Sequence, residues 1–316
     1  MFVPHTLFKS KLPALFLSTL VFALLQVFTS SPSLAKTTNS LEVASFNLRW
    51  YGSKKFPPHN DEERDGHLTR FFKTYYKDTD IFLFQEITDP LRLQKTIGRG
   101  YKCLSTRNRG SSYQYVVTCY NPKTVAPVGV SKDVHDTDRT FDISFKIFGL
   151  RNALYLQFQS LQNKTKFLHT INVHLRASPM HSEFRVQQMA SLFDQIIEQG
   201  LHKEKGLVIG GDFNAFSKDS TRMKKDDIYL YLDQADRRSL ELHTEFALTT
   251  HLGSGKNRFF DYLLVPKANW LNTYEMFVAC SLHASKEPKS YENPKYYKDY
   301  ISDHCPISLQ VPLRDL

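Results

Sequence analysis

The chain has 316 residues, of which 41% are hydrophobic, and it carries a formal net charge of +9 with an isoelectric point near 9.2. Beyond residue 35 it contains no apolar run long enough to span a membrane, no internal repeat and no low-complexity linker, which excludes a polytopic membrane protein and a repeat architecture. The positive charge suits a polyanionic partner such as nucleic acid, although a basic exported protein without such a partner would have the same charge.

Residues 1–35 have the features of an export signal. Lys9 and Lys11 precede an apolar stretch, residues 14–28, that is shorter than the ~20 apolar residues of a spanning helix. We expect cleavage after Ala35 and a single domain without internal repeats, residues 36–316. We expect this domain to be periplasmic or secreted, without stable membrane association. An uncleaved membrane anchor is the alternative.

The hydrophobic periodicity predicts two amphipathic helices within a series of strands. The first helix follows an N-cap residue, Asn60, and the second covers residues 183–199 and ends at Gly200. The β-prone segments, in chain order, are residues 41–46, 80–85, 113–120, 143–148, 153–159, 166–173, 207–210, 259–265, 274–279 and 307–311. Because strands mostly follow strands, this order favours two sheets packed face to face with helices outside.

The four cysteines lie in residues 36–316, where an oxidising compartment permits pairing. Cys103 and Cys119 are symmetric about a turn-like segment, residues 108–112, so a hairpin folded there brings them opposite each other. Cys280 and Cys305 then either pair or remain free. Zinc ligation is the alternative, but no CxxC spacing supports it. We therefore expect one hairpin disulfide.

Polar residues stand at the ends of several predicted strands, where catalytic residues of packed α/β sandwiches gather. The most specific segment is Gly210-Gly211-Asp212-Phe213-Asn214, which follows an apolar strand directly. Its glycines let the backbone approach closely, and Asp212 and Asn214 lie on the same side of an extended segment. Both side chains can therefore point at one phosphate group.

Hydrolysis of a phosphate ester needs charge neutralisation at the phosphate, an activated water and a proton for the leaving oxygen. Asn47, Glu86 and Asp303 offer the oxygen ligands that Mg²⁺ prefers, and the bound ion stabilises developing negative charge. Taken alone, Glu86 is better explained as a solvent-exposed carboxylate at a strand end. Its assignment as a ligand depends on the neighbouring motifs.

His304 is the candidate general base, because an imidazole with a pKa near ~6.5 can accept a proton from water at neutral pH. Asp261, flanked by apolar residues, can hold its other nitrogen, although a structural cap or a buried salt bridge explains Asp261 equally well. His174 ends a predicted strand, where an ordinary core histidine is the alternative. Arg151 can clamp a phosphate with two hydrogen bonds, and a solvated turn arginine is its alternative.

Together these segments resemble the endonuclease/exonuclease/phosphatase superfamily and, within it, the DNase I-like branch. The resemblance covers nearly all of residues 36–316, and Arg151-Asn152-Ala153 looks like the arginine that precedes a central strand of the family. Residues 174–179 are similar to the histidine segment of pancreatic deoxyribonuclease. The segments that occur in the order of the family are Ser45-Phe46-Asn47, Phe84-Gln85-Glu86, Asn172-Val173-His174, Gly210-Gly211-Asp212-Phe213-Asn214, Phe260-Asp261-Tyr262 and Ser302-Asp303-His304.

The resemblance implies an α/β fold of the α+β type, a four-layered sandwich of two mostly antiparallel sheets flanked by helices. It also implies Mg²⁺ dependence, with Mn²⁺ as an alternative and Ca²⁺ as an activator, and cleavage with one or two metal ions. The implied roles are metal binding by Asn47 and Glu86, orientation of the phosphate or of a second ion by Asp212 and Asn214, a base formed by His304 with Asp261, and an acid formed by His174.

One position departs from the DNase I-like pattern, in which a glutamate partners the acid histidine. The corresponding stretch is Tyr113-Gln114-Tyr115, so Gln114 or a neighbour stands at that place without a carboxylate. We therefore expect a lower pKa or a weaker acid role for His174.

These observations predict an exported, monomeric, Mg²⁺-dependent DNA endonuclease. The alternative is a phosphoesterase acting on a lipid or an inositol phosphate, because His174-Leu175 followed by Arg185-Val186-Gln187-Gln188 also looks like the pattern of those branches. A catalytically inactive binding module is a third hypothesis. The complete set of candidate catalytic residues argues against it.

Overall fold

The protein is described by a computed structural model that covers residues 39–53, 61–107, 113–130, 136–144, 150–215, 227–244, 251–252, 260–267, 273–281 and 284–316. The predicted export signal, residues 1–35, and the predicted N-cap Asn60 lie outside these residues. Within the described ranges, no helix combines the length and the apolar character needed to cross a membrane.

The first sheet has seven strands in the order β13-β14-β1-β2-β4-β3-β6. Most neighbouring pairs are antiparallel, whereas β1 runs parallel to β2 and β3 runs parallel to β6. The bounds are β1 (Ser40–Tyr51), β2 (Ile81–Ile87), β3 (Lys102–Thr106), β4 (Tyr115–Tyr120), β6 (Asp136–Thr137), β13 (Thr273–Met276) and β14 (Ile307–Pro312).

The second sheet has the order β11-β12-β10-β9-β8-β5, and the short strand β7 also pairs with β8. Here β9 and β10 are parallel and their other neighbours are antiparallel. The bounds are β5 (Val125–Pro127), β7 (Thr140–Phe141), β8 (Ala153–Ser160), β9 (Phe167–His174), β10 (Leu207–Asp212), β11 (Leu242–His243) and β12 (Asp261–Pro266).

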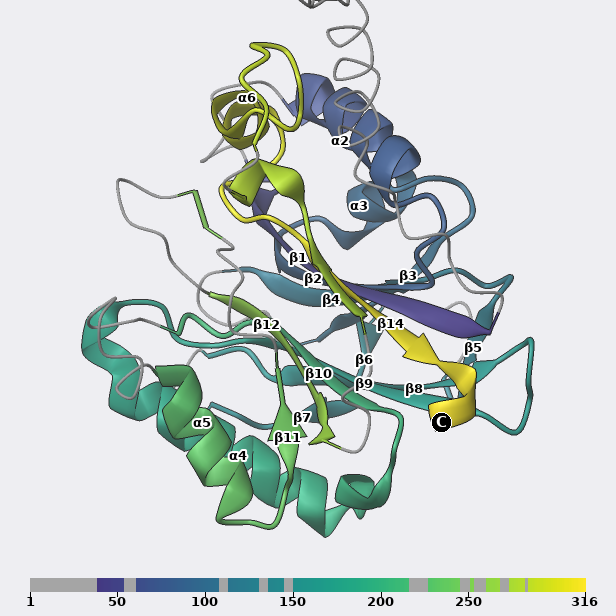
Figure 1. Cartoon of the computed structure of the whole chain (residues 1–316), viewed down its shortest axis with the longest axis vertical. Helices are drawn as coiled ribbons and strands as arrows, with labels where there is room; N and C mark the ends of the chain where they lie inside the picture. Colours follow the sequence, from purple (N-terminus) through teal and green to yellow (C-terminus); the bar gives the residue numbers. More distant parts are fainter. Residues whose placement is uncertain are drawn as a thin grey trace, which may run out of the picture. The chain divides into compact units, whose positions relative to one another are not determined.

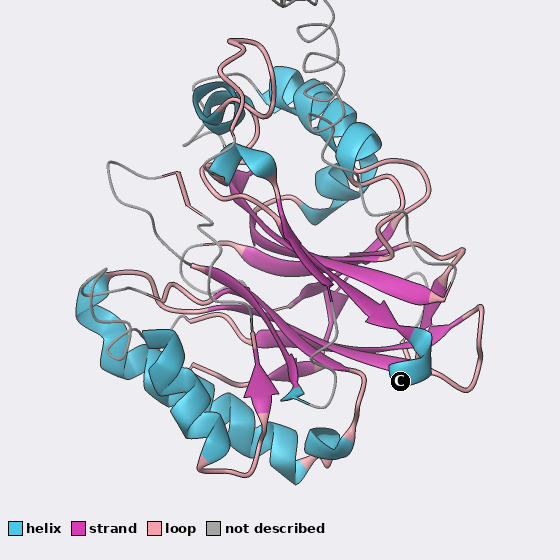
Figure 2. Ribbon diagram, viewed as in Figure 1, coloured by secondary structure: helices cyan, strands magenta, loops and turns pink. Residues whose placement is uncertain are grey.

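The two sheets pack face to face, and helices cover their outer faces (Figure 1; Figure 2). The first sheet is covered by α2 (Asp61–Tyr75), α3 (Pro90–Thr96) and α6 (Pro294–Tyr300), and the second by α4 (Ser182–Glu198) and α5 (Asp227–Asp236). The central strands are buried on both faces, which explains why β10 reads as a continuous apolar run in the sequence. The predicted four-layered α/β sandwich with two mostly antiparallel sheets is confirmed.

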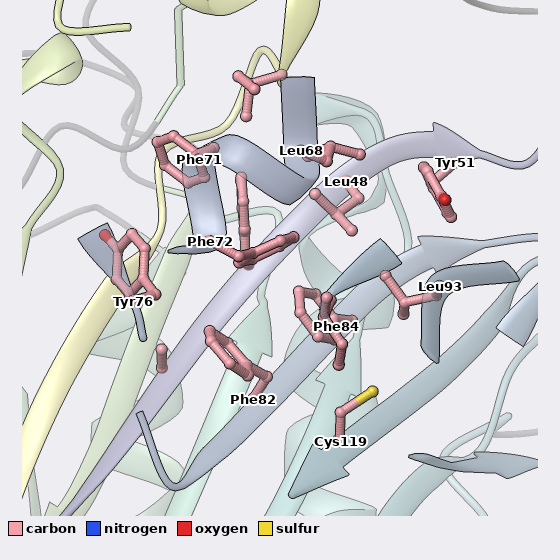
Figure 3. Packing of buried hydrophobic residues seen from close by; sticks show 14 of the residues in the cluster. Leu48, Tyr51, Leu68, Phe71, Phe72, Tyr76, Phe82, Phe84, Leu93 and Cys119 are labelled. Atoms are coloured by element: carbon pink, nitrogen blue, oxygen red, sulfur yellow. The ribbon is translucent and has the colours of Figure 1, made fainter. Parts of the chain in front are cut away.

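An aromatic cluster fills the space between α2 and the outer face of the first sheet (Figure 3). Phe72 of α2 packs over Phe82 and Phe84 of β2, whose rings stack on each other at 5.1 Å, and Phe71 of α2 contacts Phe72. These four side chains are at most 2% exposed. Because the helix spacing places its aromatic residues on one face, burial of this face fixes α2 on the sheet.

Two strand predictions are partly wrong. Ile143 and Ser144 have no strand conformation, and the rest of the predicted strand at residues 143–148 lies outside the described residues. The predicted strand at residues 274–279 ends at Met276, and a 3₁₀ turn, Val278–Cys280, follows it. That turn places Cys280 for a disulfide with Cys305, and this covalent constraint outweighs the β-propensity of Val278.

All four cysteines form disulfides. Cys103 and Cys119 occupy directly opposed positions of β3 and β4, which is the pairing that hairpin symmetry predicts. The sequence left open whether Cys280 and Cys305 pair or remain free, and the structure shows that they form a disulfide with each other. Cys305 follows His304 directly, so the second disulfide anchors the segment that carries the candidate base.

Candidate active site

The candidate catalytic residues from both sheets gather at neighbouring strand ends. In the second sheet, Asp212 is the last residue of β10 and lies directly opposite His174 of β9 and Asp261 of β12. In the first sheet, Asn47 of β1 lies beside Gln85, the residue before Glu86 of β2. The strand register therefore brings together residues that are far apart in the sequence.

Asn47 joins the two sheets at this point. Its amide nitrogen donates a hydrogen bond to Glu86 Oε1 at 3.2 Å and another to Asp212 Oδ2 at 2.8 Å. Burial, opposed by the charge of His304 and reinforced by that of Asp261, raises the pKa of Asp212 to about 7. A cation bound nearby would lower this pKa, because a positive charge favours the ionised form of the Asp212 carboxyl.

His304 and Asp261 form a buried dyad. The His304 Nδ1 atom lies 2.8 Å from Asp261 Oδ2, an arrangement that orients the imidazole and leaves its Nε2 atom for chemistry. Burial alone would lower the pKa of His304, but the charge and hydrogen bond of Asp261 raise that pKa to about 10. The backbone is also fixed, since Ser302 Oγ accepts from His304 N and donates to the Asn47 carbonyl oxygen.

His174 has the opposite electrostatic environment. Its Nε2 atom lies 3.6 Å from Asp212 Oδ2 and 3.9 Å from Glu86 Oε1, and its buried Nδ1 atom has no hydrogen-bond partner among the described residues. Burial, followed by the positive charges of Arg151 and His304, lowers the pKa of His174 well below its ordinary value. The side chain is therefore a neutral imidazole at neutral pH.

Gln114 contacts Arg151, where the DNase I-like pattern would place a glutamate against the acid histidine. The Arg151 guanidinium is buried and donates a hydrogen bond from Nη1 to Gln114 Oε1 at 2.9 Å. Burial lowers the pKa of Arg151, whereas the charges of Glu86 and Asp212 raise it. Arg151 is thus part of the site, and the solvated turn arginine considered as its alternative is excluded by its burial.

The last residues of β1 and Glu86 of β2 have a strained backbone at the site. Arg49 and Trp50 have φ angles of 41° and 52°, and Glu86 has a φ angle of 61°. Hydrogen bonds from backbone N–H groups to side-chain oxygens hold these conformations. Arg49 N donates to Asn47 Oδ1 at 2.9 Å, and Trp50 N donates to Glu86 Oε2 at 3.1 Å. Non-glycine residues rarely adopt positive φ angles, and such strain is concentrated at functional sites.

The segment around Asp212 explains why two glycines precede it. A Cβ atom on Gly211, whose φ angle is 149°, would lie 2.0 Å from the Val173 carbonyl oxygen. A Cβ atom on Gly210 would lie 2.5 Å from a methyl group of Leu263. Asn214, with a φ angle of 45°, is held by a hydrogen bond from its backbone N to Asp212 Oδ1. The glycines therefore allow close strand approach beneath the catalytic carboxylate.

Two site residues were not predicted from the sequence, Arg49 and His251. Arg49 Nε lies 3.4 Å from Asp303 Oδ2, and its position two residues after Asn47 at a strand end was the available signal. His251 pairs with His304 as an isolated β-bridge, and their rings lie 4.7 Å apart. His251 belongs to no regular strand, so no pattern in the sequence marked it.

The donor groups at the site fit a divalent cation. Glu86, His174 and Asp212 each offer one donor atom, and these atoms lie within 4.8 Å of one another. Asp303 Oδ1 is buried and has no hydrogen-bond partner among the described residues, so it also offers a free oxygen donor. The Asn47 amide nitrogen, however, faces the carboxylates, so metal binding through its oxygen requires the amide to rotate and stays a prediction.

Comparison with known proteins adds independent information. A sequence model described as the endonuclease/exonuclease/phosphatase family matches residues 44–304. Among solved structures, an endonuclease/exonuclease/phosphatase from Bacteroides vulgatus is 15% identical, with a TM-score of 0.60 over 87% of this chain and 99% of that one. The human Nocturnin catalytic domain with bound sulfate is 15% identical, with a TM-score of 0.57 over 87% and 95% of the two chains.

A mannosyl-6-phosphatase from Bacteroides thetaiotaomicron is 16% identical, with a TM-score of 0.53 over 86% of this chain and 100% of that one. A search of curated proteins gives no match. At these identities, the solved structures establish the shared fold alone.

Proposed function

This chain belongs to the endonuclease/exonuclease/phosphatase family, and we propose that it is an exported, Mg²⁺-dependent endonuclease that cleaves DNA. Members of this family are hydrolases that act on phosphate esters, and they usually depend on a divalent metal. The observation that carries the proposal is the His304–Asp261 dyad beside Asp212, because it sets a candidate proton acceptor next to carboxylates that can hold a divalent cation.

A divalent cation held by Glu86 and Asp212, with Asp303 as a further oxygen donor, would supply charge neutralisation for the phosphate and for two of the carboxylates, Asp212 and Asp303, that raise the pKa of His304. With those carboxylates neutralised, the pKa of His304 falls and its Nε2 atom can accept a proton from water. Asp261 holds the ring in place during this transfer and stabilises the imidazolium that forms. Asn47 orients Glu86 and Asp212 through its amide nitrogen.

The leaving oxygen requires a different group, because His174 is neutral in this environment. Arg151 is buried beside His174 and its charge interacts with Glu86 and Asp212. We assign the electrostatic stabilisation of the leaving oxygen to Arg151, and to His174 a hydrogen bond from its neutral ring, while the leaving oxygen takes its proton from solvent water. This division replaces the protonated acid of the DNase I-like pattern, in agreement with Gln114 at the position of the glutamate.

The choice of DNA rests on the formal charge, which is +9 for the whole chain and +7 once Lys9 and Lys11 leave with the predicted export signal, on the histidine segment at residues 174–179 and on that signal itself. Two disulfides are consistent with an oxidising compartment, periplasmic or extracellular. The expected partner is therefore DNA as a substrate, bound by a monomer through its phosphates.

A lipid phosphodiester is the second candidate substrate. Met180 is 87% exposed and Phe184 is 39% exposed in the segment that follows His174, and exposed apolar side chains suit contact with a lipid. In addition, a neighbour in the fold comparison is named as a mannosyl-6-phosphatase, so the fold carries activity on substrates other than nucleic acid.

Nicking of supercoiled plasmid by the purified protein tests the proposal. The reactions contain Mg²⁺, Mg²⁺ with Ca²⁺, or EDTA, and His304→Ala is compared with Arg237→Ala, whose exposed ion pair with Asp233 lies on α5. We expect metal-dependent nicking that His304→Ala reduces by at least a hundredfold and Arg237→Ala leaves unchanged. Intact plasmid with hydrolysis of sphingomyelin or inositol phosphates would reject DNA as the substrate and retain the metal-dependent site.

A further inference from the structure

A second group of donors meets at His304, and it differs in chemistry from the oxygen-rich group around Glu86. His251, Asp303 and His304 each offer one ligand atom, and the three atoms lie within 4.8 Å of one another. Two of the donors are imidazole nitrogens. His251 comes from a segment that neither the sequence motifs nor the proposed hydrolysis uses.

The distances between these donors suit a small ion. His251 Nε2 lies 3.7 Å from Asp303 Oδ2, and two donors at ~2.0–2.1 Å from a tetrahedral ion are themselves roughly 3.3 Å apart. The backbone keeps the two segments in register, because Leu252 N donates to the Asp303 carbonyl oxygen at 2.7 Å. The His251–Asp303 pair is therefore a few tenths of an ångström from this spacing, and the His304 donor lies within 4.8 Å of both.

His304 has the outer partner that a metal-binding histidine normally has. Asp261 Oδ2 engages its Nδ1 atom at 2.8 Å, which leaves the Nε2 atom as the available ligand. Asp303 Oδ1 is buried without a hydrogen-bond partner among the described residues, so the carboxylate has a free oxygen as well. The Phe260 ring lies 5.0 Å from His251 and 6.0 Å from His304 and gives these donors an apolar wall.

Two imidazoles and one carboxylate favour a transition metal over Mg²⁺, which prefers oxygen ligands alone. We propose that His251, Asp303 and His304 form a zinc site, and that zinc bound there inhibits hydrolysis by occupying the Nε2 atom of His304. The binding site itself is independent of the substrate. Its inhibitory effect rests on the proposed function.

Arg49 contributes a competing positive charge. Its Nε atom lies 3.4 Å from Asp303 Oδ2, the same oxygen that faces His251. A zinc ion at this carboxylate therefore displaces the guanidinium. For this reason Arg49→Gln is expected to bind zinc more tightly than the wild type, by about a factor of three or more.

Isothermal titration with ZnCl₂ in millimolar Mg²⁺ measures the site directly, and the absorption spectrum of bound Co²⁺ reports its coordination. We compare the wild type with His251→Gln and with His202→Gln as a control that removes a histidine elsewhere. We expect one zinc ion per chain, at least tenfold weaker binding for His251→Gln, and affinity close to the wild type for His202→Gln.

Thermal unfolding without zinc establishes that each variant is folded. Zinc affinity that is equal in the wild type and in folded His251→Gln, or an absence of zinc binding by the wild type, overturns the site. Inhibition is measured for each variant against its own zinc-free rate, and loss of inhibition in His251→Gln supports the inhibitory role. Zinc binding through His251 in a protein that hydrolyses none of the tested substrates supports the site and rejects the proposed function.

Discussion

His304 and His174 lie in the same site, yet their pKa values move in opposite directions. Both are buried, and burial lowers the pKa of either imidazole. At His304 the carboxylate of Asp261 outweighs burial, whereas at His174 the charge of Arg151 adds to burial. The hydrogen-bonded carboxylate of Asp261 therefore makes His304 the positively charged histidine before metal binds, whereas His174 has no such hydrogen bond at its buried Nδ1 atom among the described residues.

Replacement of Asp261 by Asn tests this explanation. The pKa of His304 is raised from 6.5 to about 10, so its protonation contributes stability that is complete below pH 6.5 and is lost as the pH rises through about 10. Without the carboxylate, burial is opposed only by weaker charges, and we expect the pKa of His304 to fall by two units or more. Histidine NMR titration of the metal-free protein measures this change. A pKa near 10 in the variant would assign the shift to another group.

Gly211→Ala tests the close approach of β10 to β9. The added Cβ atom would lie 2.0 Å from the Val173 carbonyl oxygen at a φ angle of 149°, so we expect a loss of about 3 kcal/mol or more in the free energy of unfolding. The control is Gly100→Ala, which meets nothing within 4 Å and is expected to change stability by less than about 1 kcal/mol. Urea denaturation measures both, and equal effects would contradict the account.

The sequence located most site residues because they stand at the ends of readable strands. Asp212 follows an apolar run and Asp261 begins one, so strand pairing brings them together without further information. His251 lies in no strand, and its place depends on a single bridge to His304. The orientation of Gln114 toward Arg151 depends on side-chain geometry, which a residue pattern does not contain.

At the scale of elements, α4 and α5 are joined by a buried ion pair that also holds the loop after His174. Arg185 is fully buried and binds Asp227 with its Nη2 atom. Its Nη1 atom donates to the carbonyl oxygens of Arg176 and Ser178, at 3.0 and 2.6 Å. The apolar periodicity of residues 183–199 predicts this helix, but it does not indicate that a charged residue, Arg185, is fully buried on its inner face.

We expect Arg185→Met to lower the free energy of unfolding by about 3–5 kcal/mol, because the Asp227 carboxylate stays buried without its main cationic partner. The double variant Arg185→Met/Asp227→Leu should lose less, since no buried charge remains. Arg237→Ala, which removes the exposed pair with Asp233, should cost less than about 0.5 kcal/mol. Urea denaturation that finds equal losses for Arg185→Met and Arg237→Ala would refute the structural importance of the buried pair.

The short helices α3 and α6 were not predicted, although each has a clear local signal. Both begin with an N-cap residue followed by proline, Asp89-Pro90 and Asn293-Pro294, and both cap side chains accept hydrogen bonds from backbone N–H groups. Each helix has seven residues, which is too short for a periodic apolar face. The capping residues, rather than a hydrophobic pattern, are therefore the sequence signal for these two helices.

At the scale of the described domain, the apolar pattern determines that two sheets pack together but not how they are aligned. A buried hydrogen bond between the sheets, from Gln85 Nε2 to Asn172 Oδ1 at 2.7 Å, contributes to that alignment. Gln85 precedes Glu86 and Asn172 lies two residues before His174. The same contact therefore helps to bring the catalytic carboxylate of one sheet to the histidine of the other.

The central claim is that water attacks a DNA phosphate at this site with the help of His304 and a divalent metal. Cleavage of a duplex oligonucleotide in H₂¹⁸O, followed by mass spectrometry, tests it most directly. The account predicts that each new phosphate end carries one ¹⁸O atom, that EDTA stops the reaction, and that His304→Ala slows it by at least a hundredfold. Intact DNA, phosphate ends without ¹⁸O, or an undiminished rate in His304→Ala would contradict it.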